Sequence, residues 1–449
     1  MAQAVQAEAS LPVPRRAVLY LSLFVYQVFL LGVFFGFLVW RLVFDRRYRR
    51  GVPERLGFVQ ESEPGRQVVW IHGVSVGEVK AADTLIARLR ETRPDLELVI
   101  SSTTPTGYAL AKTLHPDLRV ILYPLDLGLC PGMALRRIRP ICVLLMELEV
   151  WPNFLQATAG LDIPVAVING RISEQSFRRY RMVRALLPQF NLIWLYCMQD
   201  ESYRDRLLKL NVDPARTRVT GNMKYDNVQL PEADAEIAEL RKWLSPDGRL
   251  VVVCGSTHGE EERWLATTVL AIEEDLGIRV RTVLAPRHPE RAPGVRDGLF
   301  ARGMRVGMWS EQMRKREPLA DDEMLIVDTI GHLEKFYGAC DVAFIGGSLV
   351  KRGGQNMVEA AAMGKAVIFG PHTSNFRKDV DLLLGADAAC QVTDLADLDA
   401  KLRTLLTDSG RRVGLGERAV GLIQRNQGST DRTLEHLEPI LRREARAQG

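Results

Sequence analysis

A carboxylate follows the first strongly apolar segment of the chain, at a turn made of small residues. In the stretch WIHGVSVGE, the pattern over Val68–His72 indicates a buried strand, and Glu78 stands where an amphipathic helix begins. A carboxylate held at such a turn can act as a general base toward a substrate hydroxyl. Acids in a first turn also stabilise the helix dipole, so both a catalytic and a capping role are open for Glu78. His72 has a similar ambiguity, because a core histidine with satisfied hydrogen bonds needs no chemical role.

Two further acids follow a second apolar segment. In MELEVWPN, the expected strand Ile141–Met146 runs directly into Glu147 and Glu149. Carboxylates two residues apart share one face of an extended chain, but a turn between them would separate them. Since the strand is expected to end at Met146, the sequence predicts that only one of these two acids faces a ligand.

Several segments in the second half of the chain are suited to holding a phosphate. GSTHGEEE and APRHPER, residues 255–262 and 285–291, each follow an expected strand, and small residues at such turns expose backbone N–H groups to an anion. Arg287 adds a planar cation that matches phosphate geometry. A glycine-rich loop within residues 345–364 leads into an expected helix, where Glu359 could accept hydrogen bonds from ribose hydroxyls. The loop has neither dinucleotide-binding nor P-loop spacing.

The elements that must position these residues alternate between apolar strands and amphipathic helices. Such alternation predicts parallel sheets covered by helices on both faces, whose ligands bind beyond the carboxyl ends of the strands. A polar stretch, Tyr225–Glu236, separates two such series. The expected fold class is therefore α/β, with two Rossmann-like doubly wound domains. The expected strands are Val68–His72, Glu97–Ser102, Val120–Tyr123, Ile141–Met146, Pro164–Ile168, Leu192–Met198, Val219–Met223, Leu250–Cys254, Val280–Leu284, Arg305–Met308, Met324–Val327, Val342–Ile345, Ala366–Phe369 and Ala389–Val392.

One segment near the N-terminus differs from the rest. Residues 17–40 carry no charge and are long enough to cross a ~30 Å hydrocarbon core as a transmembrane helix. More arginines follow this segment than precede it, which places the large C-terminal body in the cytoplasm. The alternative is a helix buried against the body or lying in the membrane interface. We expect a membrane anchor with its basic flank over residues 1–45, an N-terminal Rossmann-like domain over 46–228, and a C-terminal Rossmann-like domain with a helical tail over 229–449.

A second segment mixes basic and apolar residues. Ser176–Phe190 contains four arginines, and it is either a further contact with an anionic bilayer or a core-packed helix with a solvated basic face.

The net charge is only +4 with no long basic run, which argues against nucleic-acid binding. Six cysteines without a CxxC pair favour reduced core thiols over a disulfide framework or a zinc site. Asp397 and Asp399 form a nominal DxD pattern on an expected solvated helix face, so neither a metal nor a cofactor is expected.

Nine motifs, in this order, resemble those of the 3-deoxy-D-manno-octulosonic acid (Kdo) transferase family. The resemblance implies the glycosyltransferase B fold and an N-terminal membrane anchor. It also implies inverting transfer of Kdo from a CMP-Kdo donor to the lipid A precursor (lipid IVA), at the cytoplasmic face of the inner membrane, in lipopolysaccharide biosynthesis. The implied partners are therefore the donor, the lipid acceptor and membrane lipids. The motifs are WIHGVSVGE, STTPTGY, ELEVWPN, INGRIS, GNMKYD, STHGEEE, PRHPER, DTIGHL and GGSLVKRGGQN.

The resemblance also implies roles for individual residues. Glu78 matches the catalytic base of the family, and Glu147 and Lys224 match positions that stabilise the transition state. The implied CMP-binding residues are Arg287, His288, Ile330, Gly331, His332, Asn356, Met357, Val358 and Glu359.

Three positions of the implied donor site depart from the family pattern. Gln355 stands where the family usually has histidine, Met357 where it often has proline or leucine, and His332 where it usually has glutamate. These departures leave two alternatives open. One is an enzyme of the same architecture with another donor, such as a UDP-sugar, and the other is a membrane-tethered nucleotide-binding protein without catalysis.

Overall fold

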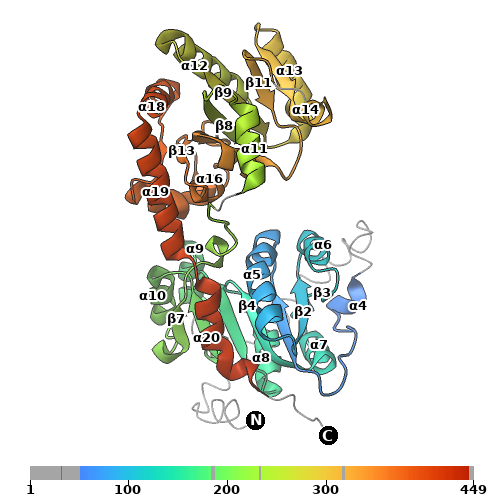
Figure 1. The fold of residues 1–449 in the computed structure, drawn as a ribbon. Coiled ribbons are helices and arrows are strands. Elements are labelled where there is room, and N and C mark those ends of the chain that lie inside the picture. Colours follow the sequence, from blue (N-terminus) through green and yellow to red (C-terminus); the bar gives the residue numbers. More distant parts are fainter. Residues whose placement is uncertain (1–31, 33–50, 184–187, 232–233, 316–318, 444–449) are drawn as a thin grey trace. The chain divides into compact units, whose positions relative to one another are not determined.

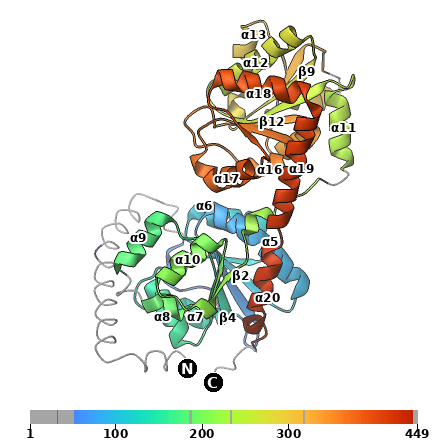
Figure 2. The same cartoon turned by 90° about the vertical axis from the view of Figure 1, so that its left-hand side faces the viewer.

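The chain forms two compact α/β units, each built around its own sheet (Figures 1 and 2). The computed structural model describes residue 32 and residues 51–183, 188–231, 234–315 and 319–443. Of these, the residues up to Asn227 and those from Gln427 onward form unit 1, and Val228–Asn426 form unit 2. Each unit contains one seven-stranded parallel sheet.

The sheet of unit 1 has the strand order β3-β2-β1-β4-β5-β6-β7. The strand order reverses between β1 and β4, and ligands of doubly wound sheets bind beyond the strand ends at this switch point. Successive residues of β1 alternate between two buried clusters, with Val68 and Trp70 in one and Val69 and Ile71 in the other, so both faces of the sheet are covered. The strands are β1 (Val68–His72), β2 (Glu97–Ser102), β3 (Arg119–Leu122), β4 (Pro140–Met146), β5 (Val165–Gly170), β6 (Leu195–Met198) and β7 (Thr217–Val219).

Helices follow most strands of unit 1, as the alternating pattern predicts. The last strand was expected over Val219–Met223 but lies over Thr217–Val219, so it begins and ends earlier than predicted. It ends at Val219, and the side chain of Asn222 then caps the 3₁₀ turn η4 (Met223–Tyr225). The other helices are α4 (Val52–Arg55), α5 (Val76–Thr92), α6 (Pro105–Leu114), α7 (Cys130–Ile138), α8 (Pro152–Gly160), α9 (Glu174–Val183), η2 (Pro188–Leu192), α10 (Glu201–Lys209), η3 (Pro214–Arg216) and α20 (Ser429–Leu441).

The sheet of unit 2 has the order β10-β11-β9-β8-β12-β13-β14, with its switch point between β8 and β12. Its strands are β8 (Leu250–Thr257), β9 (Val280–Pro286), β10 (Arg305–Met308), β11 (Glu323–Ile326), β12 (Val342–Ile345), β13 (Ala366–Phe369) and β14 (Cys390–Gln391). Its helices are α11 (Ala235–Leu244), α12 (Glu261–Leu276), η5 (Pro289–Arg291), α13 (Ala292–Phe300), α14 (Trp309–Lys315), α15 (Leu333–Ala339), α16 (Val358–Ala362), η6 (Ser374–Phe376), α17 (Arg377–Gly385), α18 (Leu395–Thr407) and α19 (Ser409–Asn426).

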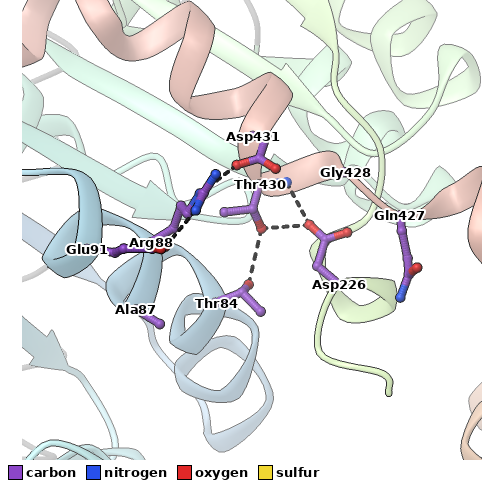
Figure 3. Close-up of a pocket in the computed structure, with 9 residues that line it drawn as sticks. All are labelled: Thr84, Ala87, Arg88, Glu91, Asp226, Gln427, Gly428, Thr430 and Asp431. Atoms are coloured by element: carbon purple, nitrogen blue, oxygen red, sulfur yellow. Dashed lines mark hydrogen bonds and ion pairs between the residues drawn. The ribbon is translucent and has the colours of Figure 1, made fainter. Parts of the chain in front are cut away.

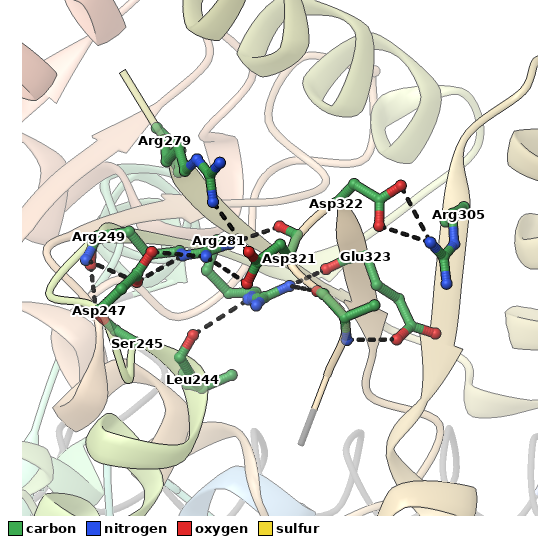
Figure 4. A network of polar contacts seen from close by, with 12 residues as sticks. Leu244, Ser245, Asp247, Arg249, Arg279, Arg281, Arg305, Asp321, Asp322 and Glu323 are labelled. Carbon is green, nitrogen blue, oxygen red and sulfur yellow. Dashed lines mark hydrogen bonds and ion pairs between the residues drawn. The ribbon is translucent and has the colours of Figure 1, made fainter. Parts of the chain in front are cut away.

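A network of arginines holds the amino ends of the strands in unit 2 (Figure 4). Arg281 of β9 is 1% exposed, and its guanidinium donates to the backbone oxygens of Leu244 at 3.1 Å, Ala320 at 2.9 Å and Glu323. Arg249 pairs with Asp247 at 2.7 Å and Asp321 at 2.9 Å. Buried carbonyl oxygens need donors, and this network supplies them where the ladder hydrogen bonds of the strands end.

The C-terminal tail is divided between the two units. The sequence suggested one helical tail belonging to the second domain, but the helix is interrupted at Gly428, whose φ is 80°. After this break, α20 belongs to unit 1, where Leu437 and Ile440 join the core that lies on one face of the sheet. Asp226 caps the beginning of α20 by accepting from the N–H and the hydroxyl of Thr430, each at 2.6 Å. Amphipathic periodicity indicates that a helix covers a core, but not which core.

Two sequence expectations concern contact with a membrane. The apolar segment 17–40 lies outside the described residues, apart from Gly32, and no described helix is long and apolar enough to cross a membrane. In the segment 176–190, Phe177 of α9 is buried in the core of unit 1 while Arg178 and Arg179 are exposed. The described part of this segment therefore packs on the core and presents a basic face to solvent.

Candidate functional site

Glu78 lies in the first turn of α5, directly beyond the carboxyl end of β1. Its carboxylate accepts hydrogen bonds from the N–H of Val74 and from the hydroxyl of Ser75, both at 2.8 Å. Ser75 is the N-cap residue, and its hydroxyl oxygen accepts from the N–H of Glu78 at 3.4 Å. This reciprocal arrangement is a variant of the capping box, in which the carboxylate takes the N–H of the residue before the N-cap. The capping role that the sequence left open is present, and it also holds the carboxylate in one position.

Glu147 lies across the switch point, immediately after β4. It adopts the left-handed conformation, with φ of 57°, while its N–H still donates to the carbonyl of Ile168 at 2.9 Å. Nε of Arg171 donates to its carboxylate at 2.6 Å. Burial raises the pKa of Glu147, the charge of Arg171 opposes that rise, and the charge of Glu78 adds to it. Glu147 and Glu78 are therefore close enough to interact electrostatically.

Glu149 belongs to the same group of acids. Burial raises the pKa of Glu149 to about 7, and the negative charges of Glu78 and Glu147 act in the same direction. The sequence predicted that a turn would leave only one of Glu147 and Glu149 near a ligand. A left-handed turn follows β4 at Glu147, the charge of Glu78 acts on both acids, and the prediction about the ligand stays a prediction. We call Glu78, Glu147 and Glu149 the carboxylate cluster.

Lys224 lies in the turn η4, which is attached to the beginning of α5. The side-chain oxygen of Asn222 accepts from the N–H of Lys224 at 3.1 Å, and Nζ of Lys224 lies 5.0 Å from the ring centroid of Tyr225. Asn227 donates to the carbonyl of Lys80 in α5 at 3.0 Å. The lysine turn is thereby held against the helix that carries Glu78.

Asn169 positions this turn, although the sequence did not single it out. It lies near the end of β5, is 3% exposed, and has a φ of 52°. Its side-chain oxygen accepts from the N–H of Met223 at 3.1 Å. A polar residue at the end of a buried strand is a signal that could have found it.

His72 has the structural role that the sequence left open. Its Nδ1 lies 2.9 Å from the hydroxyl of Ser101, and its ring stacks on Tyr123 with 3.8 Å between centroids. Burial lowers the pKa of His72 to about 3, so the ring is neutral at physiological pH.

The expected phosphate cradle of unit 2 is filled by a side chain of the protein itself. The carboxylate of Glu261, in the first turn of α12, is 0% exposed. Backbone N–H groups from both loops at the switch point converge on it, so these amides are not free for a phosphate, and they include His258 of the turn that the sequence suggested for that purpose. The donors are His258 at 2.8 Å, Gly347 at 2.7 Å, Ser348 at 3.1 Å, Leu349 at 2.9 Å and Val350 at 3.4 Å.

Arg287 and His288 follow β9 and are exposed. The guanidinium of Arg287 has no hydrogen-bond or ion-pair partner within the part of the chain that the structure describes. The ring of His288 meets that of His258 edge-on, with 5.6 Å between centroids. Nε2 of His258 in turn lies 3.2 Å from Nε2 of Gln355, one of the three departures from the family pattern. His258 is thus a site residue to which the sequence analysis gave no role, although it lies in the motif STHGEEE.

Ile330, Gly331 and His332 connect β11 to α15. Ile330 is 85% exposed, and Gly331 has a φ of 92°, which favours glycine. His332 directly precedes α15, and its ring lies 6.1 Å from that of Trp309. This segment is open to a ligand at the same edge of the sheet as Arg287.

The last implied segment divides into accessible and buried residues. Asn356 donates to the carboxylate of Glu359 at 2.8 Å and accepts from the N–H of Val358 at 3.1 Å. Met357 and Val358 are 0% and 4% exposed, so their side chains pack in the core and do not face a ligand. The prediction that these two residues belong to a CMP-binding segment stays a prediction, and with buried side chains they would contribute through their backbone.

A separate cavity in unit 1 is lined by polar residues that do not belong to the candidate site (Figure 3). This cavity, of about 520 Å³, lies where α20 meets α5 and η4. Arg88 pairs with Asp431 at 2.9 Å, and the hydroxyl of Thr84 lies 3.2 Å from that of Thr430, which accepts from it. It contains none of the implied site residues and belongs to the docking of α20.

Comparison with known proteins identifies the family. Residues 50–227 match the family model described as 3-deoxy-D-manno-octulosonic-acid transferase (kdotransferase). The 3-deoxy-D-manno-octulosonic acid transferase of Haemophilus influenzae is 33% identical over 404 residues, which cover 88% of this chain and 93% of the relative. That of Bordetella pertussis is 32% identical over 421 residues, covering 90% and 96%. The chain belongs to the Kdo transferase family. The resemblance seen in the motifs is therefore confirmed, and the chain is a glycosyltransferase.

Solved structures show the fold of this family member. The UDP-GlcNAc 2-epimerase of Neisseria meningitidis bound to UDP-GlcNAc aligns with a TM-score of 0.54, at 14% identity, over 83% of this chain and all of that chain. A putative UDP-N-acetylglucosamine 2-epimerase from Listeria monocytogenes aligns with a TM-score of 0.52 over 84% of this chain. The Kdo transferase chain therefore has two parallel-sheet α/β units of the glycosyltransferase B type.

Proposed function

We propose that this protein transfers Kdo from CMP-Kdo to the lipid A precursor in lipopolysaccharide biosynthesis. The observation that carries the proposal is the carboxylate cluster at the switch point of unit 1, in a chain of the Kdo transferase family. Glu78 is the base in this proposal. Two of the roughly four lone-pair positions of its carboxylate are used by Val74 and Ser75, which leaves acceptor capacity for a substrate hydroxyl.

The proposed reaction is a single inverting displacement. The acceptor hydroxyl loses its proton to Glu78 as its oxygen bonds to the anomeric carbon of Kdo. The bond between that carbon and the phosphate oxygen breaks at the same time, and CMP leaves with the electron pair. CMP departs as a phosphate anion and needs stabilisation by positive charge more than a general acid. In unit 2, Arg287 supplies such charge, since it is exposed and has no partner among the described residues. In unit 1, Lys224 supplies a positive charge beside the helix that carries Glu78.

Donor binding is assigned to the exposed edge of unit 2. Arg287 and His288 are suited to the phosphate, while Ile330 to His332 offer an apolar and a polar surface to the nucleoside. The Asn356–Glu359 pair is suited to ribose hydroxyls, since a carboxylate accepts hydrogen bonds from them.

The proposed location is the inner membrane. Residues 17–40 would form a single N-terminal span, with both units in the cytoplasm. A lipid acceptor stays in the bilayer, so an anchor raises its effective concentration at the enzyme. The exposed arginines of α9 are a second point of contact with anionic lipids in this proposal.

A turnover assay tests the proposed function. The purified full chain is incubated with CMP-Kdo and lipid A precursor, and the product is identified by its mass. A parallel reaction with UDP-sugars tests the alternative donor that the three departures allow. Transfer from CMP-Kdo alone supports the proposal. Transfer from a UDP-sugar, or nucleotide binding without transfer from either donor, contradicts it.

A further inference from the structure

The buried carboxylate of Glu261 connects the two loops that meet at the switch point of unit 2. One of its oxygens accepts from His258, in the loop after β8, and from Gly347, in the loop after β12. The other oxygen accepts from the three successive amides that follow Gly347. A single side chain thus holds both loops that border the expected ligand position of this sheet.

The loops approach each other too closely for side chains to separate them. A Cβ on Gly346 would lie 2.4 Å from the Cα of Thr257, and Gly347 has a φ of 67°. The hydrogen bonds from Gly347 and Ser348 are buried, those from His258, Leu349 and Val350 are partly buried, and buried donors without an acceptor are costly. Glu261 therefore acts as an internal anion. Without its carboxylate, the converging N–H groups of the two loops would have no acceptor.

The loop after β12, which Glu261 holds through Gly347–Val350, carries side chains suited to binding a phosphate in its next residues. After Val350 come Lys351 and Arg352, which are exposed, and then Gln355, whose amide nitrogen lies 3.2 Å from His258. Burial lowers the pKa of His258 most, followed by the charge of His288 and then by the charge of Arg352. A displacement of the loop would move these groups together.

We propose that Glu261 is a positioning residue for the nucleotide-sugar donor: it holds Gly347–Val350 against His258, so that the donor phosphate is bound by side chains and not by these backbone amides. This inference rests on the proposed function. It is distinct from any direct contact, since Glu261 is fully buried and cannot touch the donor.

Glu261→Gln in the full chain tests the role through steady-state kinetics. The amide keeps the size of the side chain but places an NH₂ group against the convergent donors. We expect the KM for CMP-Kdo to rise about tenfold or more, since several hydrogen bonds to a charged group are weakened. We expect kcat and the KM for the lipid acceptor to change by less than about threefold, because only the donor loop is displaced.

Glu273→Gln is the matched control. Glu273 lies on the same helix, and its carboxylate also accepts a backbone N–H, that of Val280 at 2.7 Å, but at the far end of α12. We expect it to leave the KM for CMP-Kdo unchanged. A donor KM within about twofold of wild type in Glu261→Gln, or an equal rise in Glu273→Gln, would overturn the proposal.

Chemical rescue with formate distinguishes a positioning role of Glu261 from a general loss of folded structure in the variant. Glu261→Ala leaves a cavity lined by N–H groups that formate can fill. Formate should therefore lower the CMP-Kdo KM of Glu261→Ala, and have no effect on wild type or on Glu261→Gln. Failure of formate to restore a folded Glu261→Ala would count against an internal anion.

Amide hydrogen exchange tests the proposal on the wild-type chain, so this measurement does not require that the variants fold. The amides of Gly347–Val350 should exchange slowly without nucleotide and stay equally protected after CMP is added. Rapid exchange in the nucleotide-free protein would defeat the proposal. Wild-type turnover of CMP-Kdo is measured separately, so a failure of the proposed function is distinguishable from a failure of the role of Glu261.

Discussion

At the scale of single residues, the carboxylate of Glu78 combines a capping role with a proposed catalytic one. Glu78→Gln keeps the side chain able to cap, because glutamine also serves in a capping box. It cannot take a proton, so we expect kcat to fall by about 10²–10⁴-fold, the usual contribution of a general base. Affinity for CMP should stay unchanged, since its assigned contacts belong to unit 2. Turnover and calorimetry on the same variant check both statements.

Ser75→Ala is the control for Glu78→Gln. It removes the N-cap hydroxyl but leaves the carboxylate, and should cost about 0.5–2 kcal/mol of stability. Its turnover should fall far less than that of Glu78→Gln. Similar rates in the two variants would mean that Glu78 acts through the helix end and not as a base.

Glu149 makes the stability of the protein depend on pH. Its pKa is raised from 4.5 to about 7 in the folded state, so the folded chain binds more protons than the unfolded chain between these values. The stability that its neutral form provides is therefore present at acidic pH and lost as the pH rises to about 7. We expect Glu149→Gln to raise the melting temperature by a few degrees at pH 8 but not at pH 4.5. A gain that is equal at both pH values would contradict this assignment.

At the scale of secondary-structure elements, the strands of unit 2 depend on a buried arginine. Arg281→Met leaves the carbonyl oxygens of Leu244, Ala320 and Glu323 without a donor, and each buried unsatisfied group costs about 1–3 kcal/mol. We expect a large loss of stability in thermal unfolding. The control Arg279→Ala removes an exposed pair with Asp321, and should cost no more than about 1 kcal/mol. Equal losses in the two variants would show that the network is not what stabilises these strands.

At the scale of the whole molecule, the chain leaves unit 1, forms unit 2 and returns to unit 1 with α20. Removing residues after Gln427 would expose the core surface that Leu437, Ile440 and Leu441 cover, and each buried aliphatic side chain contributes about 1.5–3 kcal/mol. We expect this truncation to destabilise unit 1 while unit 2 keeps its fold and its affinity for CMP. Limited proteolysis with fragment identification would check this. Cleavage confined to unit 2 would contradict the division.

The sequence by itself determined the class of fold and many of its strands. The bounds expected for β1, β2, β10, β12 and β13 are those observed. Buried parallel strands need continuous apolar runs, and such runs can be recognised without knowledge of their partners. The ends of strands that stop in capped turns were less predictable, as at β7, because side-chain hydrogen bonds decide where those strands end. Glu147 was found because it directly follows an apolar strand, and Glu78 because it begins the helix after one.

Only the tertiary structure decided how the acids of the chain are used. From spacing alone, Glu261 is one of several acids in a first helical turn, and the turn that precedes it was expected to offer its amides to a phosphate. The structure brings this turn and the glycine loop together, although Gly347 follows Glu261 by 86 positions in the sequence. It likewise buries Met357 and Val358 and joins α20 to unit 1. A local pattern determines which face of an element is apolar, but contacts between distant segments follow from how whole elements pack, which no local pattern contains.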